Sequence, residues 1–148
     1  MAAPEAAEDP VWAEMEVPAP PAFSTAKLID IDMGPNVALS FGIDPAAASI
    51  GKDGVVRYVV VAQSRGGAST AMYEGIKCDT GQVKTYARYN DSKWSLASNP
   101  EWRTLFNNAA YRHALAFAKQ GACSNTSPPR SINEMVRDMK SPRSDLAH

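Results

Sequence analysis

One strand, apolar on both of its faces, constrains the fold of this sequence most. Between residues 55 and 61 the alternate positions are Val55, Val59 and Val61 on one side, and Val56, Tyr58 and Val60 on the other. Such a strand belongs in the middle of a sheet that is covered on each face. Arg57 breaks the pattern, and we expect its guanidinium to reach water along its aliphatic stem.

The neighbouring segments predict an antiparallel meander around this strand. A turn at residues 64–67, with two glycines free to adopt positive φ, leads into a return strand over residues 68–77. A tight turn at residues 79–81 then precedes a third strand over residues 82–90. Shorter strands are predicted before the hairpin, near residues 28–31 and 37–43.

Helical signals appear only after the strands. Asn99 is a candidate cap, Pro100 suits the first helical position, and apolar residues at helical spacing predict a helix over Trp102–Lys119. Ser131 with Glu134 three residues later has the spacing of a capping box and predicts a final short helix. The predicted fold is therefore α+β, an antiparallel meander with C-terminal helices packed on one face.

Composition divides the chain into an arm, a domain and a tail. Residues 1–25 are rich in proline and alanine and predict an extended or disordered arm, whose Trp12 and Phe23 we expect to dock on the chain's own domain. Residues 26–141 are predicted to form a single α+β domain, and residues 142–148 are expected to fray. The start of the chain lacks the basic and apolar regions of a signal peptide, so we interpret it as a mature chain.

Charge and hydropathy argue against two classes of partner. Sixteen acids and fifteen bases give a net charge of −1, so no overall field attracts nucleic acid or anionic lipid. Lys84, Tyr86 and Arg88 alternate as a small basic and aromatic patch, which we interpret as a solvent-facing side of the third strand rather than a nucleic-acid site. No apolar run approaches the roughly 20 residues of a membrane-spanning helix.

The chain has two cysteines, Cys78 and Cys123. Their even number favours a disulfide in an exported protein, where it would tie the end of the hairpin to the end of the helix. Two buried reduced thiols in a cytosolic protein are the alternative. Without a Cys-x-x-Cys motif or nearby histidines, a zinc or redox site is not expected, and the sequence predicts no metal and no cofactor.

The blocks that run from Asp53 to Tyr58 and from Tyr73 to Cys78, together with Trp94, Glu101-Trp102 and Cys123, resemble the cryptic neisserial protein 1-like family. The resemblance covers nearly everything after the proline-rich arm. It implies a small beta-proteobacterial protein of the periplasm or cell envelope, made with a signal peptide or lipoprotein signal, and it supports the disulfide. It implies no activity, and a possible lipid anchor on the precursor stays open.

No motif for a nucleophile, a phosphate loop or a cofactor appears, so no catalytic residue is predicted. His113 is interpreted as a surface or packing residue, and Glu74 as a structural ion-pair partner of Arg57 or Lys77 or as a hydrogen-bond anchor. We predict a binding or structural protein of the envelope, whose partner is an unknown envelope protein or ligand. The alternative is a small enzyme with a Glu74–Arg57 cleft. The candidate binding residues are Arg57, Tyr73, Glu74, Trp94 and Trp102.

Overall fold

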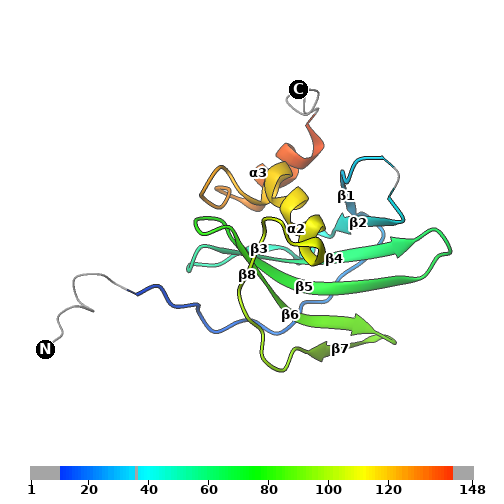
Figure 1. Cartoon of the computed structure of the whole chain (residues 1–148), viewed down its shortest axis with the longest axis horizontal. Coiled ribbons are helices and arrows are strands. Elements are labelled where there is room, and N and C mark those ends of the chain that lie inside the picture. Colours follow the sequence, from blue (N-terminus) through cyan, green and yellow to red (C-terminus); the bar gives the residue numbers. More distant parts are fainter. Residues whose placement is uncertain (1–10, 36, 142–148) are drawn as a thin grey trace, which may run out of the picture.

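The computed structural model describes residues 11–35 and 37–141, and a single antiparallel sheet lies at its centre (Figure 1). The strands follow the order β1-β2-β4-β5-β6-β7, while β3 pairs with β4 and β8 pairs with β6. Their bounds are β1 Ile29–Ile31, β2 Leu39–Ile43, β3 Ser49–Ile50, β4 Val55–Ser64, β5 Ser69–Lys77, β6 Gln82–Asn90, β7 Lys93–Leu96 and β8 Arg103–Thr104.

The predicted central strand is confirmed as β4. It pairs with β2 on one side and with β5 along its length on the other, from Val55 opposite Lys77 to Gln63 opposite Ser69. The first eight residues of β4 are all buried, because both faces of the sheet are covered. The strands β4 to β7 form the meander that the turn signals predict, and the α+β fold class is confirmed.

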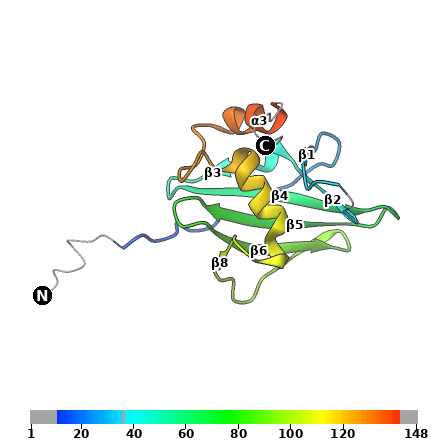
Figure 2. The ribbon, with the colours of Figure 1, turned by 45° about the horizontal axis from the view of Figure 1, so that its top comes forward.

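Helices cover one face of the sheet, which we call the helix face (Figures 1 and 2). They are the 3-10 turn η2 Ala109–Tyr111, the helix α2 Arg112–Phe117, its π-helical continuation η3 Ala118–Ala122, and α3 Ile132–Lys140. Phe117 packs edge-on against Tyr58 of β4, and Met135 of α3 is completely buried in the same core. A Cβ at Gly121 would lie 2.7 Å from the carbonyl oxygen of Met135, so this glycine permits the close approach of η3 to α3.

The predicted helix over Trp102–Lys119 is wrong in its first half. Residues 103 and 104 instead form β8, an edge strand paired with Gln82 and Val83 of β6. Asn107 has a positive φ of 52°, and the Asn108 side chain caps η2 by accepting a hydrogen bond from the amide of Ala110. The turn chemistry of these two asparagines starts the helix later than the apolar spacing predicts.

Two further predictions, the cap of the last helix and the disulfide, are confirmed. Ser131 caps α3 by accepting a hydrogen bond from the amide of Glu134 at 3.1 Å. Cys78, directly after β5, forms a disulfide with Cys123, directly after η3. The bridge therefore joins the central hairpin to the helical layer, as the positions of the cysteines predict. The predicted frayed tail at 142–148 lies outside the described residues.

The arm covers the opposite face of the sheet, which we call the arm face. Residues 11–23 contain neither helix nor strand and run behind the sheet before the chain rises into β1 (Figure 1). Val17, Phe23 and Leu28 pack against an apolar cluster that includes Val59, Val61, Ala71, Tyr73, Tyr86 and Ala87. The predicted docking of Trp12 and Phe23 is confirmed by their ring contacts with the domain, while the first ten residues lie outside the described ranges.

The arm also explains two wrong predictions. Arg57 does not reach water: it is 1% exposed, because the arm lies over it. Tyr86 does not face solvent, because it lies with Lys84 on the face that the arm covers, and a bulge in β6 opposite Tyr73 and Glu74 turns Arg88 to the other face. The extra residue places Tyr86 and Ala87 together on the arm face and reverses the alternation of the residues that follow.

Candidate functional site

A buried carboxylate from the arm organises the arm face. Glu14 accepts hydrogen bonds from Arg57 at 2.8 Å, from Lys84 at 2.6 Å and from the hydroxyl of Tyr86. The second carboxylate on Arg57 is Asp53, whose two oxygens lie 2.8 and 3.3 Å from the guanidinium. Charge-assisted hydrogen bonds of this kind are the strong ones, so the arm is fixed by electrostatics as well as by apolar contact.

The pKa values on the arm face follow from this arrangement. Burial alone would raise the pKa of Glu14, but the hydrogen bonds from Lys84, Tyr86 and Arg57 outweigh it and hold the pKa below its usual value. The pKa of Asp53 is lowered in the same way, since hydrogen bonds from Arg57 and the backbone outweigh its burial. Both groups therefore stay ionised in the folded protein at neutral pH.

A glycine of the central hairpin makes room for this cluster. A Cβ at Gly75 would lie 2.5 Å from the Tyr86 hydroxyl and 2.9 Å from a methyl group of Val55. Without a side chain at this position, the Tyr86 ring can cross β5 and present its hydroxyl to Glu14. The glycine of the Tyr-Glu-Gly sequence at 73–75 is therefore needed to leave space for the Tyr86 ring.

Aromatic side chains hold the rest of the arm. Trp12 packs edge-on against Trp102 at 5.9 Å between ring centroids and donates its indole hydrogen bond to the Asp53 carbonyl. The Tyr73 hydroxyl donates to the carbonyl of Pro18 at 3.2 Å. Further along, Phe23 contacts Trp94 at 5.7 Å. The arm therefore crosses the whole face on a series of aromatic contacts.

The structure brings together four of the five predicted binding residues, and each contacts the arm. Arg57 binds Glu14, Tyr73 binds Pro18, Trp94 packs on Phe23, and Trp102 packs on Trp12. A role for these residues toward another molecule stays a prediction. In this structure, the groups that the sequence suggests for binding hold a segment of the same chain.

Glu74, the fifth predicted residue, lies on the helix face. It is 0% exposed and accepts hydrogen bonds from the Tyr58 hydroxyl at 2.7 Å and the Thr85 hydroxyl at 3.4 Å. His113 of α2 approaches it through Nε2 at 3.0 Å. Because Arg57 lies on the arm face, the predicted Glu74–Arg57 pair and cleft are wrong, and Lys77 pairs with Asp79 instead.

His113, interpreted from the sequence as a surface or packing residue, is indeed a packing residue, and it also has a specific polar partner. Its imidazole is buried, stacks on the ring of Phe41 at 4.9 Å between centroids, and is oriented by Glu74. The hydroxyl of Tyr111 lies 2.7 Å from Thr85 and extends this polar network toward η2. A Glu–His pair of this kind fixes which ring nitrogen faces the remaining space.

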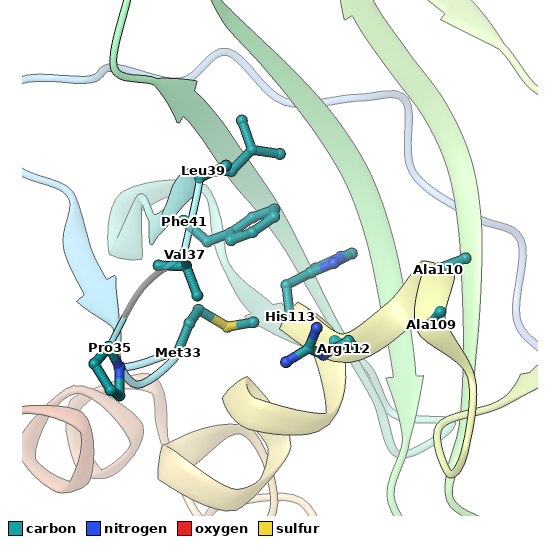
Figure 3. A pocket seen from close by; sticks show the side chains of 10 residues that line it. Met33, Pro35, Val37, Leu39, Phe41, Ala109, Ala110, Arg112 and His113 are labelled. Carbon is teal, nitrogen blue, oxygen red and sulfur yellow. The ribbon is translucent and has the colours of Figure 1, made fainter.

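That remaining space is a groove of about 480 Å³ between the β1–β2 segment and the start of α2 (Figure 3). Its volume is within the range of small-molecule sites. Figure 3 shows Arg112 and His113 on one side and Phe41, Val37 and Met33 on the other. The remaining lining residues are Pro35, Ala38, Leu39, Ala109 and Ala110. We call this space the His113 groove.

The groove has one apolar wall and one polar wall. Phe41 and Leu39 belong to β2, and Leu39 is exposed. Nε2 of His113 is directed at Glu74, and no described residue forms a hydrogen bond with the other ring nitrogen, Nδ1. Among residues 11–35 and 37–141, no three His, Cys, Asp or Glu side chains are placed to hold a metal ion. The apolar wall and the polar wall can each contact part of an organic molecule.

The sequence contains a signal for Glu74 but none for the groove. Along β5, Glu74 alternates with Met72 and Ile76, so it falls on an apolar face and requires a buried partner. Nothing nearby in sequence identifies His113, 39 positions away, as that partner. The groove joins residues 33–35 and 37–41 to residues 109–113, and only the folded chain shows that they meet.

The fold and these two faces define a class: a small α+β protein with one disulfide, in which a meander is covered by helices on one face and by its own arm on the other. The chain belongs to the CNP1-like family, whose model matches residues 7–140. No curated protein and no solved structure matches the chain. Within the described ranges, none of the helices has the length and apolar character needed to cross a membrane.

Proposed function

We propose that this is a binding protein of the cell envelope that acts through the His113 groove. Three surfaces of such a fold could bind a partner: a sheet face, a groove between sheet and helix, or the arm. The arm and the sheet face beneath it are engaged with each other through Glu14, Arg57 and Lys84. The groove is open to solvent, which favours it as the binding surface.

One observation carries the proposal: an open groove of small-molecule size ends at a histidine held by a buried glutamate. A buried carboxylate is costly unless it is paired and hydrogen-bonded, and Glu74 meets this condition through Tyr58, Thr85 and His113. The same contacts fix the imidazole at the edge of the groove, where it can contact a ligand. The exposed side chain of Leu39 beside it adds apolar surface for contact.

The envelope location rests on the family resemblance and is supported by the disulfide between Cys78 and Cys123. On this proposal the precursor carries an export signal, with or without a lipid anchor, and the partner is an envelope protein or ligand. Fractionation of the source cells, with alkylation of free thiols before lysis, tests the location. Recovery in the cytosol with reactive thiols would refute it.

Native mass spectrometry of protein purified from its own compartment tests the groove. We expect a copurifying molecule, and we expect Ala109→Trp to abolish it by filling the groove. Ala97→Trp is the matched control, because Ala97 is also exposed but follows β7 at the opposite edge of the sheet. If both variants retain the copurifying molecule equally, the molecule binds outside the His113 groove.

The Glu74–His113 pair also favours a second candidate, an envelope enzyme in which His113 is a general base. Glu74 would orient the imidazole, and Nδ1 would take a proton from a bound molecule. This replaces the Glu74–Arg57 cleft, which the structure excludes. Incubating the copurifying molecule with fresh protein distinguishes the two: a changed mass indicates an enzyme, and an unchanged mass indicates a binding protein.

A further inference from the structure

The ligand class of the His113 groove can be inferred from its charges, an inference that rests on the function proposed above. None of the ten lining residues is acidic, whereas Arg112 and His113 are basic. Asp32 shares an adjoining hollow with Arg112 but forms no ion pair with it. Glu74 already balances His113, so Arg112 is the charge at this end of the groove that no ion pair among the described residues balances.

The side chain of Arg112 is exposed and, within the described parts of the chain, forms neither a hydrogen bond nor an ion pair. Its planar guanidinium can donate two parallel hydrogen bonds, a geometry that matches a carboxylate. Next to it, Nδ1 of His113 is free of described partners and donates a hydrogen bond when the ring is protonated. Both side chains lie on the α2 side of the groove, as Figure 3 shows.

The opposite wall has different chemistry. Met33, Val37, Leu39 and Phe41 present hydrocarbon, sulfur and an aromatic ring along the β1–β2 segment. This surface fits an alkyl chain or ring, which would remain hydrated in a site with polar groups alone. Together, the walls are complementary to a molecule with one charged end and an apolar body. A single guanidinium balances the single charge of a carboxylate better than the double charge of a phosphate.

We propose that the His113 groove binds a small carboxylic acid with an apolar chain, whose carboxylate lies against Arg112 and Nδ1 of His113 and whose chain lies along Met33, Leu39 and Phe41. Glu74 is a positioning residue in this site, because it reaches the ligand only through His113. The Phe41 ring, stacked on the imidazole, joins the apolar wall to the polar end.

The test uses the full chain, labelled with ¹⁵N, and three probes of equal chain length: octanoate, octanol and octyltrimethylammonium. Octanoate should shift the amide signals of residues 37–41 and 109–113 and bind about tenfold or more tightly than octanol, as expected for charge-assisted hydrogen bonds. Arg112→Gln should remove this preference and leave octanol binding unchanged. Arg137→Gln on α3, another exposed arginine, should leave the preference intact.

Equal binding of octanoate and octanol, or preference for the ammonium probe, would overturn the ligand class while the groove remains a binding site. Failure of all three probes to shift the groove signals would overturn this inference but not the proposed function, which the copurifying molecule tests separately. Retained octanoate preference in Arg112→Gln would also refute the assignment. Since Arg112 is exposed, this variant should fold, and His113→Gln then checks the second donor.

Discussion

Replacing Glu14 by Gln tests how the arm is attached. The substitution keeps the size of the side chain and removes its charge, so Lys84 loses its anion and Arg57 keeps only Asp53. The Tyr86 hydroxyl loses a charged acceptor as well. We expect the arm to remain near the sheet through its aromatic contacts but to open more often.

The magnitude follows from three hydrogen bonds to an ionised group, each of which contributes about 1.5–3 kcal/mol. The side chains of Glu14 and Lys84 are 13% and 14% exposed, so water replaces part of what is lost. An overall destabilisation of about 2–3 kcal/mol is therefore reasonable. For a chain of this size it corresponds to a decrease in Tm of roughly 5–10 °C.

Glu16→Gln is the control, because Glu16 lies two positions further along the same arm and is exposed. Urea unfolding measures the two free energies, and exchange of the Trp12 indole proton, bonded to the Asp53 carbonyl, reports on the arm itself. We expect faster exchange in Glu14→Gln alone. If the two variants unfold within about 0.3 kcal/mol of each other and their indole protons exchange equally, the carboxylate cluster does not hold the arm.

Three further predictions concern stability. Reducing the Cys78–Cys123 disulfide, which spans 45 positions, should cost about 4 kcal/mol in the chain-entropy model, measured by urea unfolding with and without reductant; an unchanged midpoint would contradict it. Glu14 and Asp53 have lowered pKa values in the fold, so their stabilisation should be complete above their ordinary values of 4.5 and 3.8 and disappear as the pH falls through the lower folded values. The difference between wild type and Glu14→Gln should shrink accordingly in acid, and a constant difference would refute the assignment. Ser131→Ala should cost about 1 kcal/mol by removing the cap of α3, whereas the exposed Ser124→Ala should be nearly neutral in the same thermal scan.

The sheet could be predicted because its signals are local. The doubly apolar run from Val55 to Ala62, the glycine turns and the length of β6 are all present within short segments. Local signals also produced the error in the first half of the predicted helix. The apolar residues near Trp102 have helical spacing but do not share one face, since Trp102 packs on the arm and Leu105 packs in the helix-face core.

The candidate site was less predictable, because it depends on which face each strand residue occupies. Arg57 and Glu74 are both charged residues of the central hairpin, and their sequence suggests a pair. Strand alternation places them on opposite faces, where each finds a distant partner, Glu14 or His113. A bulge at Tyr86 then changes the alternation of β6, and no residue type in that strand announces it.

The two covers of the central hairpin have a consequence for how this chain is made. One cover, the arm, precedes β4 in the chain, and the other, α2 to α3, follows it by about fifty positions. Before the second cover is synthesised, the apolar hairpin is exposed to other chains, and β-rich apolar segments aggregate readily in that state. Arg57 on one face and Glu74 on the other oppose such association while they are unpaired. In the folded protein, Glu14 of the arm joins Asp53 in pairing with Arg57, and His113 of α2 pairs with Glu74, so these two charges also favour correct docking of the covers.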